Sequence, residues 1–170
     1  MQKALFLDRD GVVNIEKNYL YKVEDFEFVD GIISLCRYYQ NKGYKIFIVT
    51  NQSGIARGYY SEDDFAKLTK WMIKRFADNG IEITKVYHCP HHPEIDGECE
   101  CRKPKPKMLL DAKDEFDIDM QNSIMVGDKS RDIQAALNAG IKKTYLFDIS
   151  GENSSQIATK TVHTLDEIRE

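Results

Sequence analysis

The sequence predicts an α/β fold with a doubly wound parallel sheet, in a single domain that spans residues 1–170. Two observations support this prediction. Apolar runs typical of buried strands alternate with segments of helical spacing, which is the order found in sheets covered by helices on both faces. The chain has 170 residues, of which 42% are hydrophobic, and can therefore bury a core of its own.

The first half of the chain begins this alternation. A continuous apolar run predicts a buried first strand at 3–8. Helical spacing that closes on a glycine predicts a helix at 31–43. A β-branched run, followed by a polar turn that contains glycine, predicts the second strand at 44–50. Ser61 and Asp64 match a capping box, which opens a long helix that a glycine closes.

The second half repeats the pattern with shorter elements. Apolar runs again mark the strands, and a proline or a closing glycine marks the ends of the helices. The expected strands are 83–89, 122–128 and 142–148, and the expected helices are 107–116, 130–140 and 164–170. The segment 11–30 shows no clear core pattern, so we expect a small flap over the site. There is no room for a large cap domain, and the cleft should be open.

The net charge and the hydropathy of the sequence argue against two classes of partner, nucleic acids and membranes. The formal net charge of -4 argues against general nucleic-acid binding, although a local cluster of cations can still hold a phosphorylated ligand. No apolar stretch is long enough to span a bilayer, and the apolar run near the amino terminus is too short for a secretory signal. We therefore expect a cytoplasmic monomer that binds neither membrane nor nucleic acid.

Carboxylates stand where two predicted strands end. Asp8 and Asp10 follow the first strand, and Asp128 follows the fourth. Ligands of doubly wound sheets bind at such carboxyl ends, and crowded carboxylates require a cation or a shared proton. Mg²⁺ prefers oxygen ligands of this kind. The simpler alternative, that Asp-Gly only marks a turn, explains one such strand better than two.

The four motifs of the haloacid dehalogenase-like phosphatases have counterparts here in the same order: DRDG at 8–11, VTN at 49–51, Lys103, and GDKSRD at 127–132. The chain resembles that family over nearly its whole length. The resemblance implies the Rossmann-like fold of the family, with Mg²⁺ held by Asp8, Asp10 and Asp128, where Asp10 contributes its backbone carbonyl.

The resemblance also implies catalytic roles. Asp8 would be the nucleophile and Asp10 the general acid/base, while Thr50 and Lys103 would hold the transferring phosphoryl group. A free aspartate has a pKa near 3.9, so Asp8 is expected to be ionised without a separate base. Asp10 must carry a proton for the leaving oxygen and later activate water. Taken alone, a strand-capping threonine and a surface lysine would be the ordinary interpretations of Thr50 and Lys103.

The loop HCPHHPEIDGECECRKPKP carries a cluster of metal-ligand residues. The spacing of Cys89, one histidine, Cys99 and Cys101 suits tetrahedral Zn²⁺ in a closed, structural site. Spacing does not separate the histidines at 88, 91 and 92, and reduced surface cysteines or a Cys99–Cys101 disulfide are alternatives. The resemblance favours His91. Outside the loop, Cys36 is expected in a helix core and His163 at the surface.

The pairing of CPHHP…CECRKP with TNQSGIARG narrows the resemblance to a branch of the family that contains sugar-bisphosphate and histidinol-phosphate phosphatases. It implies that Arg102 binds a distal phosphate, whose oxygens match a guanidinium fork. A lone arginine such as Arg57 is more often solvated. The implied substrate-contacting residues are Glu16, Lys17, Asn18, Tyr19, Asn51, Gln52, Ser53, Arg102 and Lys129.

One alternative comes from another class. A receiver domain, which stores phosphate on an aspartate without being an enzyme, also has a parallel sheet with clustered acids, a threonine and a lysine. Its acidic pair and its phosphorylated aspartate should fall on different strands, whereas one strand here carries both Asp8 and Asp10. A zinc loop also has no place in a receiver.

Overall fold

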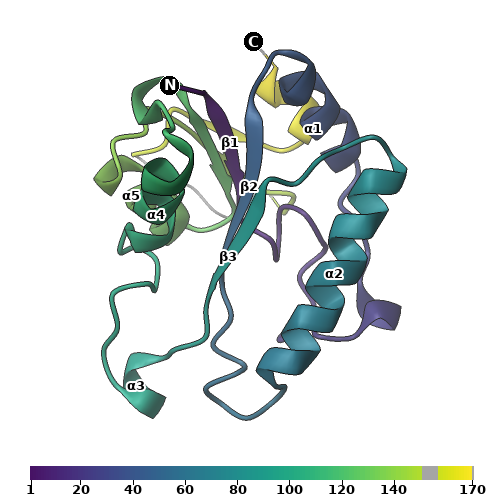
Figure 1. Ribbon diagram of the computed structural model, residues 1–170, viewed down its shortest axis with the longest axis vertical. Coiled ribbons are helices and arrows are strands. Elements are labelled where there is room, and N and C mark those ends of the chain that lie inside the picture. The colour runs from purple at the N-terminus through teal and green to yellow at the C-terminus, as the bar shows by residue number, and fades with distance from the viewer. Residues whose placement is uncertain (151–156, 170) are drawn as a thin grey trace.

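The computed structural model describes residues 1–150 and 157–169, and they form a six-stranded parallel sheet with helices on both faces (Figure 1). The strands are β1 (Ala4–Leu7), β2 (Lys45–Asn51), β3 (Lys85–Cys89), β4 (Ile124–Gly127), β5 (Lys143–Phe147) and β6 (Lys160–Val162). The helices are α1 (Ile32–Asn41), α2 (Glu62–Asp78), α3 (Pro93–Asp96), α4 (Lys107–Phe116) and α5 (Ser130–Asn138), with 3-10 turns η1 (Val23–Asp25), η2 (Met120–Asn122) and η3 (Leu165–Ile168). The predicted fold class is confirmed.

The strand order β3-β2-β1-β4-β5-β6 places β1 at the centre of the sheet. Leu5 lies opposite Ile46 of β2 on one side and opposite Ile124 of β4 on the other. The order of the strands reverses at β1, so the crevice beyond its carboxyl end is the expected ligand site of such a sheet.

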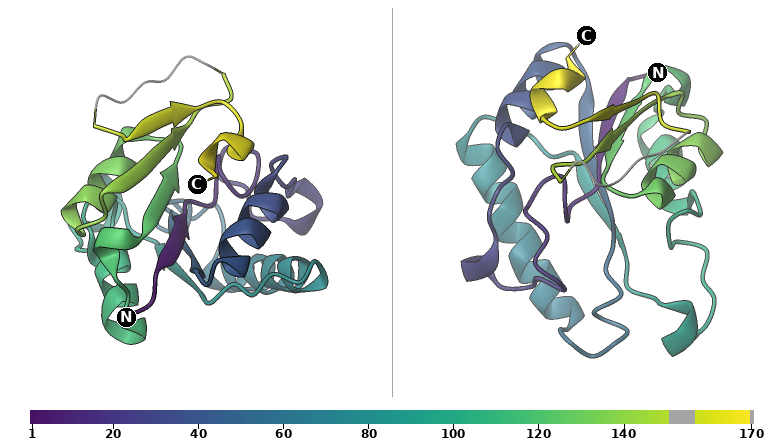
Figure 2. Two further views of the ribbon diagram at one scale, coloured as in Figure 1. Left: turned by 90° about the horizontal axis from the view of Figure 1, so that it is seen from above. Right: turned by 180° about the vertical axis from the view of Figure 1, so that it is seen from behind.

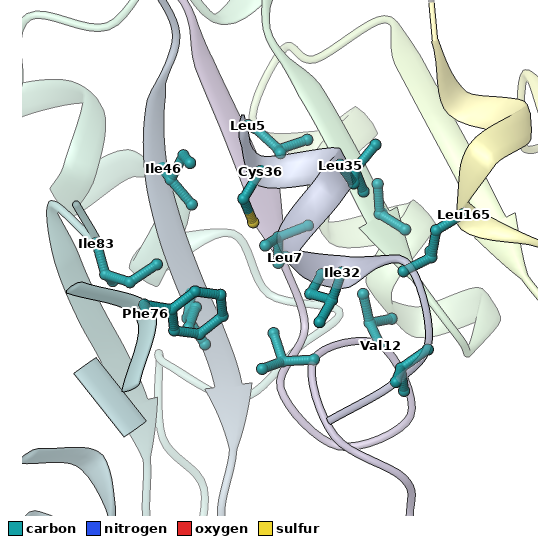
Figure 3. Packing of buried hydrophobic residues seen from close by; sticks show 14 of the residues in the cluster. Leu5, Leu7, Val12, Ile32, Leu35, Cys36, Ile46, Phe76, Ile83 and Leu165 are labelled. Atoms are coloured by element: carbon teal, nitrogen blue, oxygen red, sulfur yellow. The ribbon is translucent and has the colours of Figure 1, made fainter. Parts of the chain in front are cut away.

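Alternate side chains along β1 pack into two separate hydrophobic cores, one on each face of the sheet. Leu5 and Leu7 pack with α1 and α2, as Figure 3 shows for Leu35, Phe76 and their neighbours. Ala4 and Phe6 face the opposite way and pack with α4 and α5. Figure 2 shows these helix pairs on the two sides of the sheet. Burial on both faces is the reason that the strands read as continuous apolar runs.

The long helix α2 starts as its capping pattern predicts. Ser61 Oγ accepts a hydrogen bond from the Asp64 amide at 3.0 Å, and Asp64 Oδ2 accepts one from the Ser61 amide at 2.9 Å. Cys36 is fully buried in α1 and His163 is exposed, both as expected. Among the described residues, no helix has the length and apolarity that a membrane crossing requires.

Two parts of the fold differ from the prediction. The strand β6 was not predicted, because its three residues Lys160–Val162 carry too little pattern. The segment 11–30 is not a loose flap: Val12, Val13, Leu20 and Val29 are buried and join the core shared with α1. These residues are spaced irregularly, since the chain turns repeatedly here, and neither helical nor strand periodicity reveals them. The predicted terminal helix is the 3-10 turn η3.

Candidate active site

The central crevice brings together the carboxylates that follow β1 and β4. The Asp8 amide donates to the Val126 carbonyl at 3.1 Å, which continues the pairing of these strands past the end of β1. Gly11 lets Asp128 approach: its φ is 92°, and a Cβ there would lie 2.1 Å from Asp128 Oδ2. The DRDG turn therefore folds back directly against the carboxylate of the fourth strand.

Lys103 is a buried cation at the centre of this cluster. Its exposed fraction is 2%, and its Nζ donates to Asp8 Oδ1 at 3.0 Å and to the Val49 carbonyl at 2.8 Å. Its Nζ also forms an ion pair with Asp132 Oδ1 at 2.7 Å. The alternative of a solvated surface lysine is therefore wrong.

Asp132 is a member of the site to which the sequence analysis assigned no role. It is fully buried in the first turn of α5, where Oδ2 accepts from the Asp128 and Lys129 amides at 3.2 and 3.1 Å. Oxygens of Asp8, Asp128 and Asp132 all lie within 4.8 Å of one another. The sequence does contain a signal for Asp132, because it is the last residue of the GDKSRD motif. Spacing alone does not show that the first turn of α5 places its side chain beside Lys103.

Electrostatics in the cluster leave an excess of negative charge. Burial, together with Asp132 and Asp128, raises the pKa of Asp8 well above its ordinary value, against the opposing effect of Lys103. Burial and Asp132 raise the pKa of Asp128 to about 6. Burial disfavours ionised Asp132 too, but Lys103 outweighs it and holds the pKa of Asp132 below its ordinary value.

Three carboxylates share the buried ammonium group of Lys103, and the more exposed Lys129 Nζ lies 3.9 Å from Asp128 Oδ2. The two cations do not offset three carboxylates, and the donor set fits a hard divalent cation such as Mg²⁺. The expectation that Asp8 ionises by default needs revision, since burial makes its ionisation depend on neighbouring cations. Asp132 already bonds Lys103 and two amides, which leaves Asp8 and Asp128 as the freer side-chain ligands.

Asp10 is held apart from the carboxylate cluster by hydrogen bonds to both of its oxygens. Oδ1 accepts from Arg9 Nη2 at 2.8 Å and from Asn14 Nδ2 at 3.0 Å, and Oδ2 accepts from Gln52 Nε2 at 3.0 Å. Tyr60 in turn donates to Gln52 Oε1. The side chain of Asp10 thus has a fixed orientation, and it lines the cavity in front of the cluster.

The side chains of Asn51 and Thr50 form hydrogen bonds with other residues of the site. Asn51 Oδ1 accepts from the Lys103 amide at 3.0 Å, and Asn51 Nδ2 donates to the Lys103 carbonyl at 3.3 Å. This pair of bonds joins the end of β2 to the backbone that presents Lys103. Thr50 is 1% exposed, its Oγ1 accepts from Gln52 Nε2 at 2.9 Å, and it does not line the cavities described here.

Two cavities meet in front of the carboxylates. The inner one, of about 60 Å³, reaches Asp8, Lys103, Asp128 and Lys129. The outer one has a volume of about 240 Å³. Both share the residues Asp10, Glu16, Asn51 and Arg131, and the outer cavity is also lined by Asn18, Tyr19, Gln52, Ser53, Arg57, Tyr60 and Arg102.

Most residues predicted to contact substrate therefore gather at one cleft. Lys17 is the exception, because its Nζ donates to the Asp25 carbonyl at 2.9 Å and to Glu27 at 3.4 Å, and it does not line either cavity. Arg57 and Arg131 also lie in the cleft, although the sequence indicates no role for Arg131 and a lone arginine such as Arg57 is a weak candidate.

The cysteine loop brings its three sulfur atoms together. Cys99 Sγ lies 3.7 Å from Cys89 Sγ and 3.9 Å from Cys101 Sγ. Cys89 and Cys101 are joined as a disulfide, a pairing that the sequence analysis did not consider. Three sulfur donors within 4.8 Å fit a thiophilic metal once that disulfide is reduced.

The predicted histidine ligand is not part of this sulfur cluster. His91 Nδ1 lies 2.8 Å from Asp96 Oδ2, and the metal-competent group contains only the three cysteines. His92 Nδ1 accepts from the Glu94 amide, and His88 pairs with Glu62 and stacks on Phe65. The Asp96 carboxylate, five residues along the same loop, binds the His91 ring in place of the sulfur cluster. The spacing of metal-ligand residues along the chain does not show this contact.

Known proteins were compared with the chain. The haloacid dehalogenase-like hydrolase family matches residues 2–140. The D-glycero-alpha-D-manno-heptose-1,7-bisphosphate 7-phosphatase of Campylobacter jejuni is 65% identical over 139 residues, which cover 82% of this chain and 78% of that protein. The corresponding beta-anomer phosphatase of Vibrio cholerae is 46% identical over 98% of this chain and 92% of its own.

A solved structure agrees with these matches. The D,D-heptose 1,7-bisphosphate phosphatase from B. bronchiseptica, complexed with magnesium and phosphate, superposes with a TM-score of 0.82 at 30% identity, covering 96% of this chain and 93% of that one. A non-enzymatic receiver is therefore excluded. The chain belongs to the haloacid dehalogenase-like hydrolase family and is an enzyme of that family.

Proposed function

We propose that this enzyme removes the 7-phosphate of D-glycero-D-manno-heptose 1,7-bisphosphate, in the supply of activated heptose for lipopolysaccharide. The supporting observation is the pair of joined cavities: an inner one on the carboxylates and Lys103, and an outer one lined by arginines. A substrate with two phosphates matches both. The relatives named above act on either anomer, and the proposal covers both.

In this proposal Asp8 is the nucleophile. One of its carboxylate oxygens forms a bond to phosphorus as the bond to the sugar oxygen breaks, and Asp10 gives that oxygen a proton. Asp10, now deprotonated, takes a proton from water, which attacks the aspartyl phosphate and frees Asp8 and inorganic phosphate. Lys103, 3.0 Å from Asp8 Oδ1, offsets charge on the transferring group, and Lys129 at the rim contacts substrate.

Magnesium is the proposed cofactor, held by Asp8, Asp128 and the backbone carbonyl of Asp10. Coordination would supply charge neutralisation and orientation at the phosphoryl oxygens. The fit rests on the unbalanced carboxylates, because Lys103 and the more distant Lys129 do not offset three of them. Retention of turnover after complete removal of divalent cations would contradict this proposal.

A structural zinc ion is the second proposed metal. Cys89, Cys99 and Cys101 would bind it as thiolates, and His91 would complete a tetrahedral set. The bond of His91 Nδ1 to Asp96 leaves Nε2 available, the arrangement in which a carboxylate orients a metal-binding imidazole. Zinc and the Cys89–Cys101 disulfide exclude each other. Metal content of the purified protein, and its thiol count after unfolding without a reductant, distinguish them. Two titratable thiols, Cys36 and Cys99, without zinc would reject the site.

We also propose that residues 1–170 act as one cytoplasmic, monomeric domain without nucleic-acid or membrane partners. The competing function is hydrolysis of histidinol phosphate, which carries a single phosphate. Comparison of kcat/KM on heptose 1,7-bisphosphate and on histidinol phosphate decides between them. Preference for the bisphosphate supports the proposed function, and preference for histidinol phosphate refutes it.

A further inference from the structure

Three arginines from distant parts of the chain converge on the outer cavity. Arg57 comes from the loop between β2 and α2, Arg102 from the cysteine loop, and Arg131 from the first turn of α5. Burial and the nearby charge of Arg131 lower the pKa of the Arg102 guanidinium, with a smaller contribution from Arg57. The fold thus holds like charges close together.

The guanidinium groups of Arg57 and Arg131 form no hydrogen bond or ion pair within the described residues, although the charge of Arg131 acts on the neighbouring Asp132 carboxylate. The Nε of Arg57 is buried without an acceptor. Arg57 lies over the ring of Tyr19, with 5.8 Å from its Cζ to the ring centre, and Arg102 has only a 3.5 Å contact with the His91 carbonyl. Arg131 is exposed and Arg57 and Arg102 are half-buried, so an anion that enters the cavity can reach all three guanidinium groups.

The two acids that line the outer cavity, Asp10 and Glu16, form no ion pair with these three arginines. Both oxygens of Asp10 already accept hydrogen bonds from Arg9, Asn14 and Gln52. Glu16 Oε1 accepts from the Asn18 amide at 2.7 Å. The three guanidinium groups are therefore free to bind a ligand anion, and a phosphate can accept from several guanidinium forks at once.

The position of Arg131 differs from that of the other two arginines. Arg57 and Arg102 line only the outer cavity, whereas Arg131 lines both the inner and the outer cavity. It therefore lies where the inner and outer cavities meet. We propose that Arg131 is a specificity-determining ligand of the second phosphate, which closes a clamp with Arg57 and Arg102 and selects sugar bisphosphates over monophosphates. The inference rests on the proposed function for the identity of the substrate.

The test compares Arg131→Gln with the charge-retaining Arg131→Lys and with Arg75→Gln. Arg75 is an exposed residue of α2 that lines neither cavity, so this control removes the same charge outside the cleft. Substrates are heptose 1,7-bisphosphate and heptose 7-phosphate. We expect Arg131→Gln to lower kcat/KM about tenfold for the bisphosphate and less than about threefold for the monophosphate. The lysine variant should recover part of the loss, and the control should match the unmodified protein.

A second measurement does not depend on the sugar that the enzyme uses. Mannose 1-phosphate, which carries only an anomeric phosphate, is tested as a competitive inhibitor of p-nitrophenyl phosphate hydrolysis. Arg131→Gln should raise its inhibition constant about tenfold. Equal losses on both heptose substrates, or an unchanged inhibition constant, would overturn the clamp. Poor use of heptose bisphosphate by the unmodified protein would instead reject the proposed function, and the inhibition constant would still decide whether Arg131 binds a distal phosphate.

Discussion

Replacement of Asp128 by asparagine should stabilise the protein when no metal is present and abolish its stabilisation by magnesium. In the folded chain, burial and Asp132 raise the pKa of Asp128 from its ordinary value of 3.8 to about 6. The folded state therefore binds a proton more tightly than the unfolded state, and stability falls as pH rises from about 4 to above 6. Above that range the ionised carboxylate is a cost to folding.

The size of this cost follows from the shift. A change of roughly two pKa units corresponds to about 3 kcal/mol at most, because each unit is worth about 1.36 kcal/mol. For a chain of this size, about 3 kcal/mol corresponds to roughly 6–12 °C in Tm. Asparagine keeps the shape of the side chain and removes its charge, so the variant should melt higher than the unmodified protein by up to this amount in chelator at pH 8.

Thermal unfolding with and without Mg²⁺, at pH 5 and pH 8, measures both effects. The difference between the variant and the unmodified protein should shrink at pH 5, where Asp128 is mostly protonated in the folded state. Added Mg²⁺ should raise the Tm of the unmodified protein and leave that of the variant nearly unchanged. A variant that melts lower in chelator, or that responds to Mg²⁺ as strongly as the unmodified protein, would refute the reasoning.

Three further predictions concern other parts of the site and core. Asp10→Asn should lower kcat by about 10²–10⁴-fold, because its side chain can no longer transfer a proton, and burst kinetics should show both half-reactions slowed. Asn51→Ala should lower kcat by roughly tenfold through loss of both bonds to the Lys103 backbone, whereas a rise in KM alone would make Asn51 a plain substrate ligand. Burial raises the pKa of Cys36 to about 12, so iodoacetamide at pH 8 should label it only after unfolding, as peptide mass spectrometry would show.

The main strands and helices could be predicted from the sequence because burial in the core determines which positions are apolar. Strands buried on both faces must be apolar throughout, and the capping box at Ser61 and Asp64 is a local pattern. What escaped prediction lacks such constraints. The strand Lys160–Val162 is too short for a period, and the packing of Leu20 against the core depends on turns that periodicity does not describe.

The site residues that directly follow strands were predictable from the sequence. The site residues that a helix turn or a loop brings into the site were not. Asp8 and Asp128 stand directly after apolar runs, so topology brings them together. Asp132 reaches Lys103 only because of the geometry of the first turn of α5. Arg131 and the bond between His91 and Asp96 likewise depend on loop and helix positions in space, which spacing along the chain does not determine.

The most direct measurement is the location of the phosphoryl group during turnover. Substrate labelled at the transferred phosphate is mixed with enzyme in Mg²⁺, quenched in acid within the first turnover and digested for mass spectrometry, with Asp8→Asn as the control. We predict an acyl phosphate on Asp8, present with Mg²⁺ and missing after chelation. A label on another residue, or rapid hydrolysis with no label on Asp8 at any time of quenching, would contradict the central role of this carboxylate.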